Sequence, residues 1–557
     1  MTSVKNSFLC SAAMLALIPA ASAADLPVKK AAPIEYVRVC STFGAGFFYI
    51  PGTDTCIRLS GRARAEYGYQ QNFQRNVGLG DQSMYRGQMR INIDARTQTD
   101  YGTLRAFIRT EASSRTGNFM WSGTLQRIAK AFPATGVDQY NRVQQQFDVD
   151  KAFIQFAGFT AGRASSFFDF YAHDFEIIGV SHGSDVSATN LLAYTAQMGN
   201  GFSATLSMED PSFRKTGIYS SAVAAAGGPV GSSTAATFAI TSSPTPVFLG
   251  YGADGTPTGV GFVDVIERNR MPDFVAALRN DGAWGSAQIS GAVKDVNTGN
   301  YIAGGYLGTA AGAPLTTANA LARMRPATEY GWAIQGGVKF NLPMIAPGDT
   351  LYLQAAYAEG GTQYTGVQFF TAGYITAARP FQGASFSQYL PDATLNPLTG
   401  KLQLVETISA VASYLHYWSP QWRSAFFGSY AEINFARGAR FAQGVASVVG
   451  GTTIANSPGL PTSPGYAFNE TLRDSRQYYV GASLIWSPVR DLDIGLEGIY
   501  DNTVLRNGRV IDQNKNPGAV VASLSATGVP LNAGGVPIRT VNNTDTFQIR
   551  ARMQRDF

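Results

Sequence analysis

Arginine recurs in one alternating phase of three consecutive segments near the N-terminus. In the first segment, CIRLSGRARAEYGY (56–69), the arginines share one phase, and Ile57, Leu59 and Tyr67 lie in the other. Alternate side chains of a β-strand point to opposite faces, so each segment predicts a strand with one charged and one apolar face. Rows of fixed charge that face water set ion preference. The arginines expected to act in this way are Arg62, Arg64, Arg86, Arg90, Arg105 and Arg109.

The environment of these strands decides which face is exposed to water. In a soluble sandwich the apolar face points inward, and in a membrane barrel it points outward. An arginine that faces lipid near the middle of a membrane costs roughly 2–4 kcal/mol. Six of them would cost about 12–24 kcal/mol, which exceeds the roughly 5–15 kcal/mol that stabilises a typical fold. If this sheet spans a membrane, the arginines must therefore face the interior of a barrel.

The alternating pattern continues along the chain and predicts 16 strands. Each segment has close to the 9–11 residues that a tilted membrane strand needs. Long connections rich in Gly, Ser, Ala and Thr (115–147, 211–272, 360–406, 435–475 and 506–542) contrast with turns of a few residues. This asymmetry is typical of transmembrane barrels. The predicted strands are 56–69, 84–98, 104–109, 150–157, 159–165, 189–198, 202–210, 273–280, 284–296, 329–341, 350–359, 407–418, 421–434, 476–486, 492–503 and 543–557.

The N-terminal segment predicts export. Lys5 precedes an apolar run (8–20), and Ala21-Ser22-Ala23 has the form of a signal cleavage site, so 1–23 is expected to be a signal peptide. Residues 24–35 read as a linker before a single domain, 36–557. Export implies an oxidising compartment, so Cys40 and Cys56 are expected to form a disulfide, which contributes roughly 3 kcal/mol in the chain-entropy model.

Composition excludes other classes of protein. A net charge of +5 among 15% charged residues predicts no nucleic-acid partner. The three histidines, His173, His182 and His416, lack ligand spacing to the cysteines, so neither a metal nor a cofactor is expected.

The last predicted strand, TDTFQIRARMQRDF, extends the cationic rows. Arg550 and Arg552 lie in its polar phase, and Phe557 ends its apolar phase, which Arg555 interrupts. A terminal aromatic residue after an alternating strand resembles the assembly signal of outer-membrane barrels. If the barrel closes, the last strand neighbours the first, and closure removes the unpaired edges that hydrocarbon does not tolerate.

Two stretches resemble the alphaproteobacterial general porins: EYVRVCSTFGAGFFYIPGTDTCIRLSGRARAEY (35–67) and KAFIQFAGFTAGRASSFFDFY (151–171). The resemblance implies an all-β, 16-stranded antiparallel transmembrane barrel with short periplasmic turns and long extracellular loops. It also implies a homotrimer and one loop, about 166–187, folded into the lumen. Arg163 would then be an inward-facing residue of the wall. Opposite the arginines, the loop would present its carboxylates, which are Asp169, Asp174, Glu176 and Asp185.

The expected function is passive diffusion of small polar solutes and ions across the outer membrane, in contact with membrane lipid and lipopolysaccharide and without a reaction. A channel that prefers sugars or anions stays open as an alternative, and ion selectivity does not follow from the sequence. The composition of the loops would suit a surface adhesin, but that function does not explain arginines that face the interior of the barrel. An outer-membrane hydrolase would need a nucleophile and a base, and no G-x-S-x-G motif is present.

Overall fold

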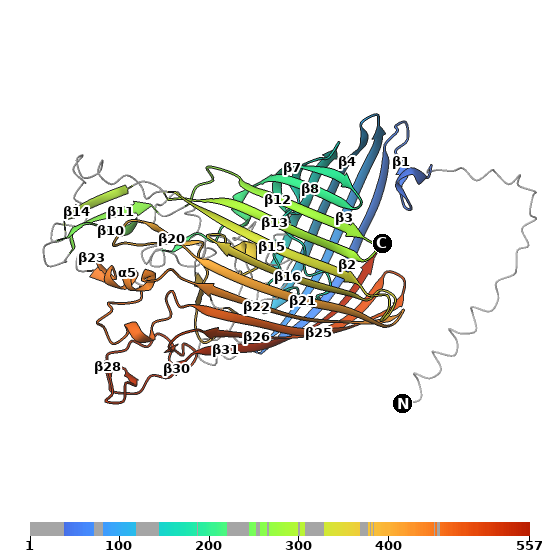
Figure 1. The fold of residues 1–557 in the computed structure, drawn as a ribbon. Coiled ribbons are helices and arrows are strands. Elements are labelled where there is room, and N and C mark those ends of the chain that lie inside the picture. Colours follow the sequence, from blue (N-terminus) through green and yellow to red (C-terminus); the bar gives the residue numbers. More distant parts are fainter. Residues whose placement is uncertain are drawn as a thin grey trace, which may run out of the picture.

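The computed structural model is an elongated β-barrel with extensive loops at one end (Figure 1). It describes residues 38–71, 82–117, 144–185, 188–219, 244–251, 257–264, 267–298, 301–306, 328–367, 377–378, 380–381, 384–449, 452–453 and 457–557. The predicted signal peptide (1–23) and linker (24–35) lie outside the described residues. Within the described residues, no helix has the length and apolarity needed to cross a membrane.

Sixteen antiparallel strands of the described chain form the closed barrel, which confirms the predicted strands. Each pairs with its neighbours in the chain, and the last strand pairs with the first, from Arg62 opposite Asp556 to Gln70 opposite Gln548. The barrel strands are β2 (Cys56–Gln70), β3 (Ser83–Thr99), β4 (Gly102–Gly117), β5 (Gln144–Phe156), β6 (Phe159–Ala164), β7 (Thr189–Gly199), β8 (Phe202–Glu209), β12 (Asp273–Gly282), β13 (Gly285–Val296), β15 (Glu329–Asn341), β16 (Thr350–Glu359), β21 (Glu406–Ser419), β22 (Trp422–Asn434), β25 (Ser475–Val489), β26 (Leu492–Leu505) and β31 (Asn543–Asp556).

The alternation along the strands separates two faces. On β2, Leu59 is 58% and Tyr67 is 44% exposed, whereas Glu66 in the opposite phase is 5% exposed. The same contrast recurs on β26, where Leu496 is 54% exposed and Glu497 is fully buried against the interior. The apolar face is therefore the outer surface of the barrel, and the charged face lines its lumen.

Short turns join the strands at one end, called here the turn end. The connections 100–101, 157–158, 200–201, 283–284, 420–421 and 490–491 have two residues each, and 342–349 is longer. Gly158 takes a φ of +86°, and a Cβ atom there would lie 2.9 Å from the carbonyl oxygen of Thr195, so the turn requires glycine. At the opposite end, called here the loop end, lie the longer connections as far as the structure describes their residues (Figure 1).

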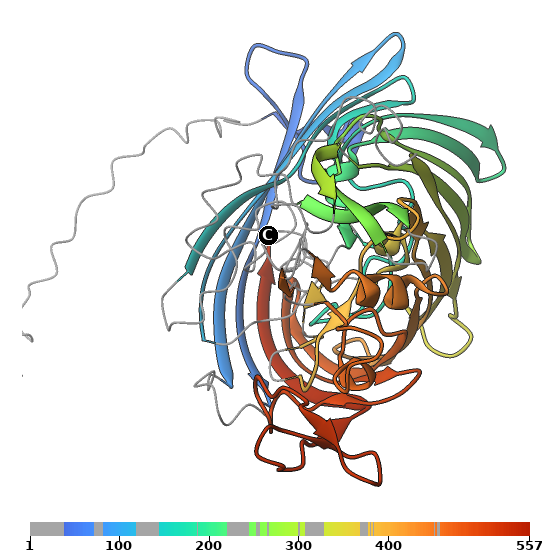
Figure 2. The same cartoon turned by 90° about the vertical axis from the view of Figure 1, so that its left-hand side faces the viewer.

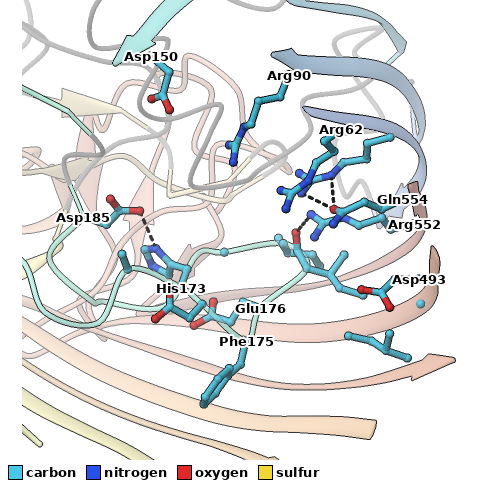
Figure 3. A pocket seen from close by; sticks show the side chains of 18 of the residues that line it. Arg62, Arg90, Asp150, His173, Phe175, Glu176, Asp185, Asp493, Arg552 and Gln554 are labelled. Carbon is cyan, nitrogen blue, oxygen red and sulfur yellow. Dashed lines mark hydrogen bonds and ion pairs between the residues drawn. The ribbon is translucent and has the colours of Figure 1, made fainter. Parts of the chain in front are cut away.

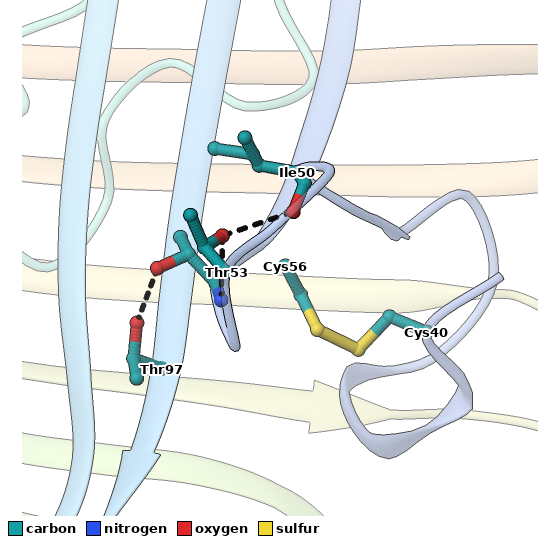
Figure 4. Close-up of a disulfide and its surroundings, with 6 residues drawn as sticks. Cys40, Ile50, Thr53, Cys56 and Thr97 are labelled. Carbon is teal, nitrogen blue, oxygen red and sulfur yellow. Dashed lines mark hydrogen bonds between the residues drawn. A yellow bond between two sulfur atoms is a disulfide. The ribbon is translucent and has the colours of Figure 1, made fainter. Parts of the chain in front are cut away.

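A small N-terminal unit sits at the turn end. It comprises η1 (Ser41–Phe43) and β1 (Phe48–Tyr49), which pairs with the start of β2. The predicted disulfide between Cys40 and Cys56 is confirmed, with Cα atoms 6.0 Å apart (Figure 4). The guanidinium of Arg96 lies 4.9 Å from the ring centre of Phe47, so this unit rests against a lumen-facing side chain of β3.

Secondary structure at the loop end is short. Two of its small sheets have three strands each, β10-β11-β14 and β20-β19-β9, and several segments lie inside the ring of strands when the barrel is viewed from this end (Figure 2). The elements there are η3 (Pro211–Phe213), β9 (Ile218–Tyr219), β10 (Pro244–Tyr251), β11 (Pro257–Asp264), β14 (Tyr301–Tyr306), η4 (Thr362–Thr365), β17 (Ala377–Ala378), β18 (Gln388–Tyr389), β19 (Ala393–Leu395), β20 (Leu402–Leu404), α5 (Ala439–Val445), β23 (Val448–Val449), β24 (Thr452–Thr453), η5 (Tyr466–Phe468), β27 (Val510–Ile511), β28 (Ser523–Leu524), β29 (Pro530–Leu531) and β30 (Thr540–Val541).

Candidate functional site

The connection between β6 and β7, called here the internal loop (165–188), enters the lumen and runs along the wall. Its first part is fixed to β13 and β15 through one backbone carbonyl. The Phe168 oxygen accepts hydrogen bonds from Ser290 Oγ at 2.7 Å and from Gln335 Nε2 at 2.8 Å. The loop then reaches β16, where the Tyr171 N–H donates to Gln354 Oε1 at 2.9 Å.

The middle of the internal loop is held by a carboxylate and a guanidinium of the wall. Glu497 of β26 accepts the N–H groups of Ile177 at 2.7 Å and Ile178 at 2.6 Å. Arg552 of β31 donates to the carbonyl oxygen of Ile177. Three polar contacts on two adjacent peptide units leave this part of the loop little freedom to move.

Two buried histidines hold the last part of the internal loop in place through hydrogen bonds. His182 contacts Ser429 Oγ at 3.0 Å and Gln477 Oε1 at 3.2 Å, and burial lowers its pKa to about 4. His173 has a φ of +59° and places its ring nitrogens 3.2 Å from Asp185 Oδ2 and 2.7 Å from the Ser181 carbonyl oxygen. Burial lowers the pKa of His173, but the charge of Glu176 and the bond to Asp185 outweigh it and raise the pKa to about 9.

A cavity of about 400 Å³ separates the internal loop from the facing wall (Figure 3). Five predicted arginines line it and are called here the arginine wall: Arg62, Arg64, Arg90, Arg109 and Arg552. Each is paired along the wall. Arg62 bonds Asp556 at 2.7 Å, Arg90 bonds Glu111, and Arg109 bonds Asp150 at 3.4 Å. The pairs hold the guanidinium groups in place while Arg62, Arg90 and Arg109 stay partly exposed to the cavity.

The other predicted basic residues lie outside the cavity lining. Arg86 is buried beside Glu66, 2.5 Å away, and Arg550 is buried next to them on β31. Arg105 pairs with Asp94 at 2.9 Å, level with Cys56 at the turn end. Arg163 donates to the carbonyl oxygens of residues 149 and 150.

Three of the four predicted loop carboxylates are bonded to partners close to the loop. Asp169 bonds Arg214 at 2.6 Å, and its charge outweighs burial and raises the pKa of Arg214. Glu176 accepts from the Tyr171 hydroxyl at 2.7 Å, and Asp185 faces the ring of His173. Asp174 differs, because it is exposed and accepts from the Tyr352 hydroxyl of β16 at 3.0 Å.

Several residues that line the cavity were not predicted from the sequence. Asp150 and Lys151 both line the cavity because the β4–β5 register shifts at this point, so two consecutive side chains reach one side. Arg423 and Asp493 form a pair at 2.7 Å on β22 and β26, beside the arginine wall, because Asp493 is the register partner of Gln554 on β31. Their inward phase on β22 and β26 is the signal in the sequence that could have found them.

Comparison with known proteins assigns this chain to a family. A family model described as a porin subfamily matches residues 25–521. This chain is a member of the porin family. The membership confirms the resemblance noted in the sequence.

Individual proteins are similar to this chain over long stretches. Porin Omp2a of Brucella ovis is 33% identical over 218 residues, which are 37% of this chain and 59% of that protein. Porin Omp2b of Brucella neotomae is 28% identical over 389 residues, 64% of this chain and 85% of that protein. Among solved structures, the outer membrane channel DcaP of Acinetobacter baumannii is 12% identical, with a TM-score of 0.47, and the match covers 91% of this chain and 99% of DcaP.

The family membership and the closed barrel together establish the general function of the protein. The porin is an outer-membrane β-barrel that provides a water-filled channel for passive diffusion of small hydrophilic solutes. Outer-membrane barrels have short turns on the periplasmic side and long loops outside, so the turn end corresponds to the periplasmic side.

Proposed function

We propose that the cavity between the internal loop and the arginine wall is the narrowest part of the passage and that it favours anions. The observation that carries this proposal is the charge of the lining. Its cationic side chains are Arg62, Arg64, Arg90, Arg109, Lys151, Arg423, Arg552 and His173, whose pKa is raised to about 9, and its carboxylates are Asp150, Asp174, Glu176, Asp185 and Asp493.

The bonding of the carboxylates supports the same direction. Glu176 and Asp185 are buried and accept hydrogen bonds from the internal loop itself, so little of their charge faces the cavity. Asp174 is the loop carboxylate that stays exposed. A passage of low dielectric focuses the remaining positive field on passing ions.

A reversal-potential measurement tests the proposed preference. In a KCl gradient across a planar bilayer, the wild-type porin should show a larger permeability for chloride than for potassium. Arg62→Gln removes a guanidinium from the cavity and should reduce the chloride to potassium ratio by about twofold. Arg105→Gln is the matched control, because Arg105 lies at the turn end outside the cavity, and its effect should be smaller. A cation-selective wild type, or equal shifts in both variants, would contradict the proposal.

The surroundings of the porin form a second part of the proposal. We infer that 1–23 is removed on export, that 24–35 remains as a periplasmic linker, and that three copies associate within lipid and lipopolysaccharide. No cofactor, metal or reaction enters this function. The outer face of the closing strands supports association, because Ala63, Ala65 and Gly87 lie there on adjacent strands and let another flat surface approach closely.

A further inference from the structure

A second loop turns into the lumen beside the internal loop. It belongs to the connection between β16 and β21, and residues 362–367, 380–381 and 384–405 of this connection are called here the insert. Tyr364 is 1% exposed and packs edge-on against Phe168 of the internal loop, with ring centres 4.7 Å apart. Phe381 packs with Ile178 of the internal loop and with Tyr479 of the wall. The insert therefore contacts the internal loop and the lumen-facing side of the barrel.

One buried carboxylate fixes the insert to the barrel. Asp392 is fully buried and forms an ion pair with Lys294 of β13, whose side chain is 1% exposed. Its oxygens also accept the N–H of Thr362 at 3.0 Å and the N–H of Thr216 at 3.1 Å. Lys294 donates in addition to the carbonyl oxygen of Arg214 at 3.2 Å. The pair thus joins the wall, the segment 211–219 and two distant parts of the insert.

This ion pair stabilises the insert more than the barrel. The barrel strands are held by their own continuous ladder of backbone pairs, whereas the short strand β19 of the insert pairs with β9 over only Ala393 and Thr394. A buried charge that loses its partner is strongly destabilising, while replacement of both members by neutral groups is often tolerated. Loss of one partner should therefore release the insert and leave the strands paired.

The burial of the wall shows what the insert does to the passage. The insert covers inward-facing polar residues of β21 and β25. Thr365 Oγ1 donates to Thr407 Oγ1 at 3.0 Å and Gln388 Nε2 donates to Ser475 Oγ at 2.9 Å, and Thr407 and Ser475 are 0% and 1% exposed. On the arginine wall, the side chains of Arg62 and Arg109 remain 25% and 23% exposed. In the view from the loop end, yellow and orange segments occupy one side of the ring (Figure 2).

We propose that the insert is a second pore-narrowing element, which fills the lumen beside β13 to β26 and confines solutes to a slot along the arginine wall. The proposal rests on the diffusion function given above and adds to it the residue pair Lys294 and Asp392 as the lock that holds the insert. The solutes selected in this way are small anions, because every solute that passes must travel beside the arginine wall.

Variants of the lock test the proposal. Lys294→Met and Asp392→Asn each leave one buried charge without its partner, so each should raise single-channel conductance by about twofold, because conductance follows the free cross-section. In liposome swelling with sugars of increasing size, both should admit larger sugars than the wild type. The double variant, which removes both charges and keeps an acceptor for the two N–H groups, should return toward the wild-type values. Arg490→Gln, in an exposed pair with Asp491 at the turn end, should change nothing.

A shortened variant keeps the proposal falsifiable if the single variants do not fold. Glu359 and Glu406 are register partners on β16 and β21, so an Asn-Gly turn can replace 360–405 in the Lys294→Met background. It should show the highest conductance and the largest sugar limit. Wild-type conductance and sugar limit in all folded variants would overturn the insert proposal. The sign of the reversal potential is measured separately, so failure of the anion proposal is distinguishable from failure of this one.

Discussion

At the scale of single residues, pairing rather than bare charge defines the lumen. Each guanidinium of the arginine wall is held by a neighbouring carboxylate or amide, as Arg64 is by Gln554 Oε1 at 2.7 Å and Arg552 by Glu66 at 2.7 Å. Long side chains lose rotamer freedom when they are held in this way. The field in the passage is therefore fixed before a solute arrives, and its strength depends on which partners keep their charge.

His173 gives the internal loop a dependence on pH. Both ring nitrogens face acceptors, Asp185 Oδ2 and the Ser181 oxygen, so the folded loop holds the doubly protonated ring, whose pKa is raised to about 9. This contribution is complete below the ordinary histidine pKa of about 6.5 and is lost as the pH rises toward about 9. We expect current noise in single open channels to increase over this interval. His173→Gln, which does not titrate, should show noise that is independent of pH, and an equal rise in both proteins would contradict the assignment.

At the scale of elements, the internal loop is a wall-bound strap with many separate anchors. It contacts β13 and β15 at its start, β26 and β31 at Ile177, and β22 and β25 at His182. Anchors spread over half the barrel fix the position of the loop more firmly than any one contact does. The anchor that offers the sharpest test is Glu497, since its two oxygens accept the N–H groups of two consecutive loop residues.

Glu497→Gln should loosen the internal loop without unfolding the barrel. A glutamine presents one acceptor and one donor where Glu497 now accepts two N–H groups. We expect larger fluctuations of single-channel current and a small rise in mean conductance, with heat-modifiable migration on gels retained. Asp501→Asn is the control, because Asp501 is equally buried on the same strand but accepts from Gln477 of the wall. If both variants fluctuate alike, Glu497 has no special role in holding the loop.

At the scale of the whole molecule, the barrel was predictable and the filling of its lumen was not. The period of two along each strand fixes which side chains face outward, so strands, closure and disulfide followed from local patterns. The course of the insert depends on Lys294 and Asp392, which lie 98 residues apart. The extra residue at Asp150 depends on the register of two strands. Such contacts arise only from tertiary packing, so the alternation of residues along one strand does not predict them.

The proposed trimer makes a prediction about the outer surface. Ala65 lies on β2 between Gly87 of β3 and Met553 of β31, whereas Ala355 is an equally exposed outward residue on β16. Tryptophan is tolerated against lipid but not in an interface built from small residues. Ala65→Trp should therefore abolish an SDS-resistant oligomer on unheated gels, while Ala355→Trp keeps it and both proteins stay heat-modifiable. Retention of the oligomer in Ala65→Trp would place the subunit contact elsewhere on the barrel, and a wild type that migrates as a monomer would reject the trimer itself.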